Sequence, residues 1–176
     1  MKKLSIVTAV LLAFGASAAH AEKVKVRLNG YQEVPAASSG GVGQFEADIR
    51  ENQLGDISIK WKLSYNNGFS SPVTQAHIHF GQRHTTGGIS IFLCSNLGNG
   101  PMGTQPCPPG PAEVEGEATA DDVVGPNGQL IAPGEIEEIV AAIRAGAAYV
   151  NIHTTTLPGG EVRGQLRGQR HGGHRH

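Results

Sequence analysis

The stretch DISIKWKLSY, residues 56–65, decides the fold class of this chain. Its isoleucine, tryptophan, leucine and tyrosine side chains occupy every second position, with serine and lysine between them. Successive side chains of a β-strand point to opposite faces, so this alternation is typical of a strand with one face buried and one in water. The stretch therefore predicts one strand of a β-rich domain.

Shorter segments with the same alternation lie on both sides of it, separated by glycine and proline. Together they predict about eight strands, over residues 24–28, 43–50, 56–65, 75–81, 89–93, 112–118, 149–153 and 161–166. The segment 112–118 carries three glutamates, which is typical of an edge strand. Many short strands with turn signals between them predict an all-β fold, an antiparallel β-sandwich or Greek-key barrel.

One segment follows a helical period instead. In EIEEIVAAIRA, residues 135–145, the aliphatic side chains recur at i, i+3, i+4 and i+7. Glutamates fall in the first turn and Arg144 in the last, which suits the helix dipole. Gly146 follows where a left-handed terminating residue is expected. We therefore expect one short helix on the rim of the sheet.

The first residues have the features of a secretory signal peptide. Lys2 and Lys3 precede an uncharged apolar run, and small residues in an A-x-A pattern end at Ala21. We expect a signal peptide over residues 1–21, one domain over 22–166, and a disordered tail rich in histidine, glycine and arginine over 167–176. The mature protein should be secreted or periplasmic, with no transmembrane segment.

Export would expose the cysteines to an oxidising compartment, and removal of the signal peptide would change the net charge of the chain. Cys94 and Cys107 are the only cysteines, and in an oxidising compartment they are expected to form a disulfide, with two unpaired thiols as the alternative. The chain has 14 basic and 15 acidic residues, and loss of Lys2 and Lys3 leaves a net charge near −3. This balance gives no reason to expect nucleic acid or an anionic membrane as a partner.

Two strand-like runs carry histidines, AHIHFG at residues 76–81 and YVNIHT at 149–154. His77 and His79 share one face of their strand, and Ala76, Ile78 and Phe80 share the apolar face. His153 faces away from the apolar side of its own strand. If the two strands are neighbours, the three imidazoles can converge on one metal ion, for which copper or zinc is expected.

Further polar residues stand close to these runs. His84 lies in the following turn and is a candidate fourth ligand, while Asn151 and Glu161 could hold an imidazole N–H. Glu161 and Arg163 have two interpretations: an exposed ion pair of small worth, which we favour, or groups that orient the histidines. The histidines could instead simply hydrogen-bond to neighbours such as Glu161 or Thr154. No G-x-S-x-G elbow or paired carboxylates favour an enzyme.

The motifs LNGYQEVP (28–35), AHIHFG, GGI (87–89), AYVNIHT (148–154) and PGGEVRGQL (158–166) resemble, in this order, the CHRD domain. This domain is named after chordin and is widespread in exported bacterial proteins. The resemblance spans roughly residues 24–166. It implies a β-sandwich like that of immunoglobulins or of copper–zinc superoxide dismutases. In chordin the domain belongs to an extracellular antagonist of growth factors, which points to protein interaction.

The H-x-H strand with a later strand histidine is also similar to the copper site of copper–zinc superoxide dismutases. By this resemblance, His77, His79 and His153 take the copper-ligand positions. The chain has no loop with the further zinc ligands and no clear bridging histidine, so the resemblance favours metal binding over dismutase activity.

Two hypotheses about function follow. The first is an exported metal-binding protein that holds copper or zinc through His77, His79 and His153, with His84 as an optional ligand. The second is a metal-free module for protein contacts outside the cell or in its envelope, using exposed aromatic residues such as Tyr31, Phe69 and Tyr149. An enzyme built on an open metal site is a third, weaker possibility.

Overall fold

The computed structural model describes residues 21–168; the expected signal peptide, except Ala21, and most of the expected tail lie outside the described residues. The described part contains eight strands and one α-helix. In chain order they are β1 (Glu22–Asn29), β2 (Val42–Glu51), β3 (Ile57–Tyr65), β4 (Val73–Phe80), β5 (Gly88–Ser95), β6 (Ala112–Ala118), α1 (Ile136–Ala145), β7 (Ala148–Thr154) and β8 (Val162–Leu166). The predicted all-β fold with one short helix is confirmed.

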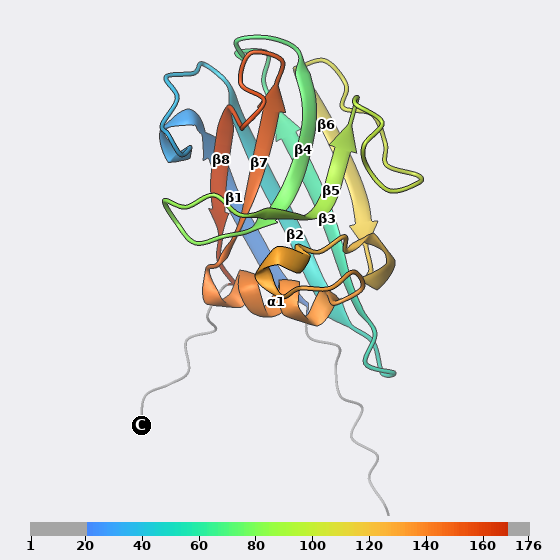
Figure 1. Cartoon of the computed structure of the whole chain (residues 1–176). Helices are drawn as coiled ribbons and strands as arrows, with labels where there is room; N and C mark the ends of the chain where they lie inside the picture. The colour runs from blue at the N-terminus through green and yellow to red at the C-terminus, as the bar shows by residue number, and fades with distance from the viewer. Residues whose placement is uncertain (1–20, 169–176) are drawn as a thin grey trace, which may run out of the picture.

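All eight strands belong to one antiparallel sheet, in the order β5-β4-β7-β8-β1-β2-β3-β6. The sheet curls into a nearly closed barrel, and α1 lies across one end (Figure 1). The strands β5 and β6 are its two edges, which confirms the edge position predicted for residues 112–118. An isolated bridge joins Ile91 of β5 to Val123, in the segment that follows β6. Of the two predicted architectures, the structure is the barrel.

The core fills the inside of this barrel with the alternate apolar side chains that the strand pattern marks. Ile59, Leu63, Ile78 and Ile152 are among its fully buried members. The buried stripe of α1 closes the end of the barrel with Ile136, Ile139, Val140 and Ile143. The helix ends at Gly146, whose positive φ of 71° is the left-handed conformation expected there.

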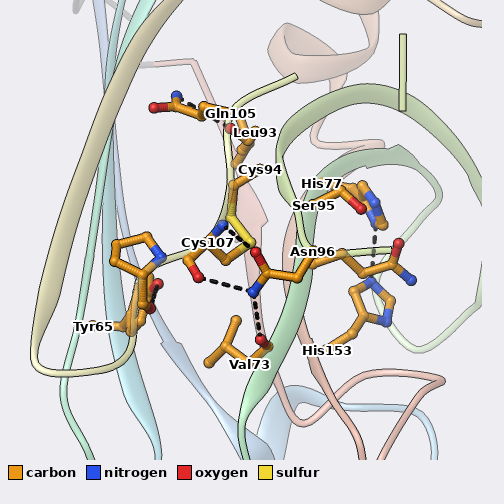
Figure 2. Close-up of a disulfide and its surroundings, with 12 residues drawn as sticks. Tyr65, Val73, His77, Leu93, Cys94, Ser95, Asn96, Gln105, Cys107 and His153 are labelled. Carbon is orange, nitrogen blue, oxygen red and sulfur yellow. Dashed lines mark hydrogen bonds between the residues drawn. A yellow bond between two sulfur atoms is a disulfide. The ribbon is translucent and has the colours of Figure 1, made fainter. Parts of the chain in front are cut away.

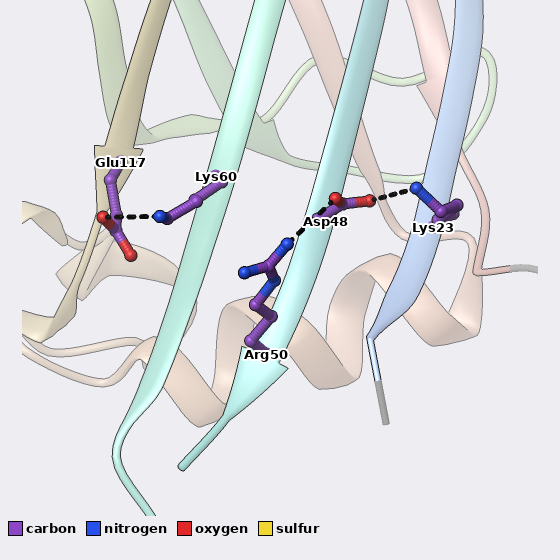
Figure 3. Close-up of polar contacts among 5 residues, drawn as sticks. All are labelled: Lys23, Asp48, Arg50, Lys60 and Glu117. Carbon is purple, nitrogen blue, oxygen red and sulfur yellow. Dashed lines mark hydrogen bonds and ion pairs between the residues drawn. The ribbon is translucent and has the colours of Figure 1, made fainter. Parts of the chain in front are cut away.

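The outer face of the sheet differs between its two halves. Over β1, β2, β3 and β6 it is open to solvent and carries ion pairs such as Lys23–Asp48 and Lys60–Glu117 (Figure 3). Over β4, β7 and β8 most outward side chains are buried, among them His77, Asn151 and Arg163, and loops fold across this face. One of these is the β4–β5 loop, residues 81–87, which passes in front of β7 and β8 in Figure 1.

The predicted disulfide between Cys94 and Cys107 is present, with the two Cα atoms 5.1 Å apart. The side chain of Asn96 anchors the loop that the disulfide closes. Its amide donates to the carbonyls of Val73 and Cys107 at 3.0 and 2.8 Å, and its oxygen accepts from the Cys107 N–H at 3.0 Å. Figure 2 shows the disulfide and the hydrogen bonds of Asn96 to Val73 and Cys107.

Candidate metal centre

His77, His79 and His153 converge on the outer side of β4 and β7, which are paired in antiparallel register. The register puts His77 opposite Asn151 and His153 opposite Gln75, so His77 and His153 are diagonal neighbours on one face. His77 Nδ1 lies 3.1 Å from His153 Nε2, and one ring nitrogen from each of the three residues lies within 4.8 Å of the others. The convergence predicted from strand alternation is confirmed.

The three rings are buried, although they lie outside the apolar interior as expected. His77, His79 and His153 are 0, 6 and 4 % exposed. Phe92 of β5 packs edge-on against His77, with ring centroids 4.4 Å apart, and Tyr149 of β7 stacks on His79 at 4.8 Å with the planes 4° apart. Aromatic side chains therefore form the walls of the cluster.

Backbone carbonyls fix the protonation of two of the rings. His79 Nδ1 is 3.0 Å from the carbonyl oxygen of Gly87, and His153 Nδ1 is 2.9 Å from that of Pro158. A carbonyl oxygen only accepts, so in both rings Nδ1 carries the proton and donates. The Nε2 of each neutral ring then holds a lone pair. This is the arrangement in which histidines that bind metals are commonly held.

The three rings have fewer N–H hydrogen-bond donors than lone pairs that could accept. His153 Nε2 can accept from His77 Nδ1–H, and His77 Nε2 is then also a lone pair. Among the described residues, His77 Nε2 and His79 Nε2 are buried without any hydrogen-bond partner. Buried polar atoms without partners are uncommon because each costs about 1–3 kcal/mol. If the proton of His77 moved from Nδ1 to Nε2, the Nδ1 atom would hold a lone pair. The cluster would then offer a metal ion three lone pairs, one from each ring.

Burial keeps the cluster neutral. Desolvation, with a smaller contribution from the neighbouring imidazoles, lowers the pKa of His77 to about 2. Desolvation likewise lowers the pKa of His79 to about 4, and it holds the pKa of His153 below its usual value. All three rings are therefore uncharged near pH 7, which is the form that binds a metal.

The donor set fits a transition metal. Nitrogen ligands at ~2.0–2.1 Å on a tetrahedral ion lie roughly 3.3 Å from one another, close to the 3.1 Å between His77 Nδ1 and His153 Nε2. Imidazole suits zinc, copper and nickel, whereas magnesium and calcium prefer oxygen ligands, and no carboxylate belongs to the three-residue group. The geometry can hold one such ion with small ring movements.

His84 is not part of this group. It is exposed, in the β4–β5 loop, and has a positive φ of 65°. The three-residue cluster within 4.8 Å does not include it. The structure thus brings together three of the four histidines predicted as ligands.

Glu161 and Arg163 do not form the expected exposed ion pair among the described residues, and both side chains are buried. Glu161 accepts hydrogen bonds of 2.6–2.7 Å from Ser39 Oγ, Ser70 N and Oγ, and Thr154 Oγ1. Burial alone would raise its pKa, but these donors outweigh burial and hold it below the usual value. The ion-pair interpretation was wrong because each of the two side chains forms hydrogen bonds with other partners.

Arg163 donates instead to backbone carbonyls of the β4–β5 loop. Its Nη1 lies 2.6 Å from the Thr85 oxygen and its Nη2 lies 2.8 Å from the Gln82 oxygen. The guanidinium also lies over the Tyr149 ring, 3.4 Å from the centroid. Asn151 donates to Glu33 and to the carbonyl of Val162, so its amide holds no histidine ring.

Several groups of the site were missed in the sequence analysis. The Gly87 and Pro158 carbonyls are backbone groups, and Glu33 lies in the irregular segment after β1. Desolvation raises the pKa of Glu33 to about 7, against the opposing effects of Arg163 and Asn151. The GGI motif that includes Gly87 was a usable signal, because a glycine is required there: an added Cβ would lie 1.7 Å from the Phe80 oxygen.

Of the comparisons with known proteins, the one with protein families gave a match that covers almost the whole described chain. None of the described helices is long and apolar enough to span a membrane. Neither the curated proteins nor the solved structures gave a match. A family model, CHRD domain, matches residues 24–166. This range includes every strand that builds the histidine cluster, and the chain therefore belongs to the CHRD domain family.

Proposed function

We propose that this protein is an exported metal-binding protein that holds one copper or zinc ion through His77, His79 and His153. The observation that carries the proposal is the buried three-imidazole group, in which carbonyls hold the Nδ1 protons of His79 and His153 and leave a lone pair on the Nε2 of each ring. A metal ion is a partner that uses three converging lone pairs at once.

The ordinary structural role of a buried histidine accounts less well for the same geometry. A histidine kept for its hydrogen bonds should satisfy both ring nitrogens, yet two Nε2 atoms of the cluster have no partner within residues 21–168. Hydrogen bonds from the rings to Glu161 or Thr154, the alternative, are not made, since the ring nitrogens bond to each other and to the Gly87 and Pro158 carbonyls. An ion bound by His77 Nδ1, His79 Nε2 and His153 Nε2 would remove the cost of the unpaired Nε2 of His79.

Copper and zinc are proposed together because the ligands are three neutral imidazoles. Affinity for such sites rises along the divalent series to Cu(II) and is lower for Zn(II), so Cu(II) should displace Zn(II) in competition. Which ion is bound in the cell also depends on metal supply.

Export is supported by the disulfide and by the signal-peptide pattern. Its test is the mass of the protein recovered from the exported fraction. Cleavage after Ala21 gives a first residue of Glu22, and the retained full-length chain would contradict export.

The metal proposal is tested on the exported protein purified without an affinity tag. Titration calorimetry with Zn(II) should show about one equivalent bound to the buried site, and His79→Ala should abolish that binding. The matched control is His84→Ala, which removes an exposed histidine from the adjoining loop and should leave the stoichiometry unchanged.

The tail histidines need a control of their own. The triple variant His171→Ala, His174→Ala, His176→Ala should keep the single tight equivalent. If the triple variant loses it while His79→Ala keeps it, the ion is bound by the tail and the proposal is wrong. Circular dichroism of each variant establishes that the barrel is folded.

The metal-free interaction module is the weaker candidate. Of the three aromatic residues expected on its surface, Tyr31 is exposed, whereas Phe69 packs against the core and Tyr149 is buried under Arg163. The described surface therefore offers one of the three expected contacts. A folded wild-type protein that binds neither Zn(II) nor Cu(II) would favour this candidate.

A further inference from the structure

Arg163 of β8 is buried, at 2 % exposed, and within the described residues it has no carboxylate partner within ion-pair distance. A buried guanidinium is expensive unless its N–H groups are hydrogen-bonded. Here two of its donors reach the Gln82 and Thr85 carbonyls, and Nη2 also reaches Gln165 Oε1 at 2.9 Å. The charged side chain thus serves mainly to hold the β4–β5 loop against the sheet.

The same loop orients a metal-ligand candidate. At its end, the Gly87 carbonyl accepts the Nδ1 proton of His79, and the Gly87 N–H donates to the Tyr149 hydroxyl at 3.1 Å. The loop therefore connects Arg163, at Gln82 and Thr85, with the hydrogen bond that sets the tautomer of His79.

A second connection runs through the rings. The guanidinium of Arg163 lies 3.4 Å above the Tyr149 ring, and the other neighbour of that ring is His79, stacked at 4.8 Å with a 4° angle between the planes. Through Tyr149, Arg163 therefore helps to fix the orientation of the His79 ring. Through the loop, it helps to fix which ring nitrogen of His79 carries the proton.

We propose that Arg163 is a positioning residue for the candidate metal centre: it holds the β4–β5 loop and Tyr149 so that His79 keeps its Nδ1 proton on Gly87 and points Nε2 at the ion. This inference rests on the proposed function. Arg163 does not touch the ion itself. The planar fork is needed because two carbonyls must be reached at once, which a lysine ammonium does not reproduce.

The test compares Arg163→Gln with the matched control Arg83→Gln, which removes an exposed arginine from the same loop. In metal-free protein, ¹H–¹⁵N spectra of the imidazoles should show His79 protonated at Nδ1 in the wild type and in Arg83→Gln. In Arg163→Gln we expect a mixture of tautomers and fast exchange of that proton. A purely structural role would lower the melting temperature without changing the tautomer.

The Zn(II) dissociation constant, measured by chelator competition well below the melting temperature, is the second readout. Arg163→Gln should raise it about 10–100-fold, the usual effect of losing a group that supports a ligand, while Arg83→Gln should stay within about twofold. If Arg163→Gln does not fold, Arg163→Lys takes its place. The lysine keeps the positive charge but does not reproduce the planar fork on the Gln82 and Thr85 carbonyls, so a smaller rise and faster exchange of the His79 proton are expected.

The inference is overturned if the folded variant keeps the His79 tautomer and binds Zn(II) within about twofold of wild type. Failure of the proposed function is a separate result: wild-type protein would then bind no metal, and the tautomer spectra of the metal-free variants would still decide whether Arg163 positions His79.

Discussion

The two halves of the sheet treat their outward side chains in opposite ways. Over β1, β2, β3 and β6, outward lysines, glutamates and aspartates stay in water and form cross-strand ion pairs (Figure 3). Over β4, β7 and β8, the outward positions are just as polar, yet His77, Asn151 and Arg163 are buried beneath loops. Both halves use the same strand alternation to fill one core.

The contrast separates what the fold needs from what it does not. The solvated half demonstrates that a polar outer face can be left in water at little cost, since exposed charges keep their hydration. Burying three histidines, an arginine and two glutamates costs free energy unless each is paired. Such burial is typical of functional sites, where local rules of stability are broken. The two halves should therefore respond differently to mutation, to acid and to salt.

The largest difference is expected from replacing one glutamate in each half. Glu161→Leu leaves the donors of Ser39, Ser70 and Thr154 without their acceptor, and hydrogen bonds to a charged group contribute about 1.5–3 kcal/mol each. We expect a loss of more than about 3 kcal/mol in the free energy of unfolding, measured by urea denaturation. Glu117→Leu, on the solvated half, is the control and should cost under about 1 kcal/mol. If both variants lost the same free energy of unfolding, the two halves of the sheet would not differ in how much they depend on their outward glutamates.

Acid should affect the buried half next. Folded His79 stays neutral down to about pH 4, whereas the unfolded chain binds a proton near the ordinary value of 6.5. The unfolded state thus holds more protons in this window, so the stability of metal-free protein falls as the pH drops from about 6.5 to 4. Glu33 opposes this, because its raised pKa adds stability as the pH falls from about 7 to 4.5.

The contribution of His79 is isolated by comparing wild type with His79→Gln at each pH. The variant should lose less stability between pH 7 and 4, by at most about 3 kcal/mol. Chemical denaturation at several pH values measures the difference. Parallel curves for the two proteins would mean that His79 is not held neutral by burial.

The smallest effect is expected for a single surface ion pair. Lys60 lies 3.8 Å from Glu117, with both side chains about half exposed. Lys60→Ala should change the free energy of unfolding by less than about 1 kcal/mol, and the change should shrink in 1 M salt, where exposed charges are screened. A loss of several kcal/mol would show that the solvated half depends on its charges as much as the buried half does.

The strands and the cluster could be predicted because both follow from alternation. DISIKWKLSY became β3 over nearly its whole length, and the isoleucines of residues 135–145 became the buried face of α1. His77, His79 and His153 met because each lies on the polar side of its strand and because β4 and β7 pair. The hydrophobic period and the residue types can be read from a short segment alone, and they were enough to predict these elements.

The cover of the site could not be predicted in this way. Whether a polar strand face is open or buried depends on loops that have no periodic pattern, such as residues 81–87. The sequence therefore predicted an exposed pair for Arg163 and Glu161 and a surface position for Tyr149, whereas all three are buried in the structure. Glu33 was missed because its hydrogen-bond partner, Asn151, is 118 residues away in sequence.

The nearly complete enclosure of the three imidazoles has a kinetic consequence. An ion cannot reach rings that are at most 6 % exposed unless part of the cover swings aside. The residence time of the proposed ion would then depend on how often the cover opens as well as on the strength of the metal–nitrogen bonds. The same enclosure that keeps water from the rings would therefore also slow the exchange of a bound ion.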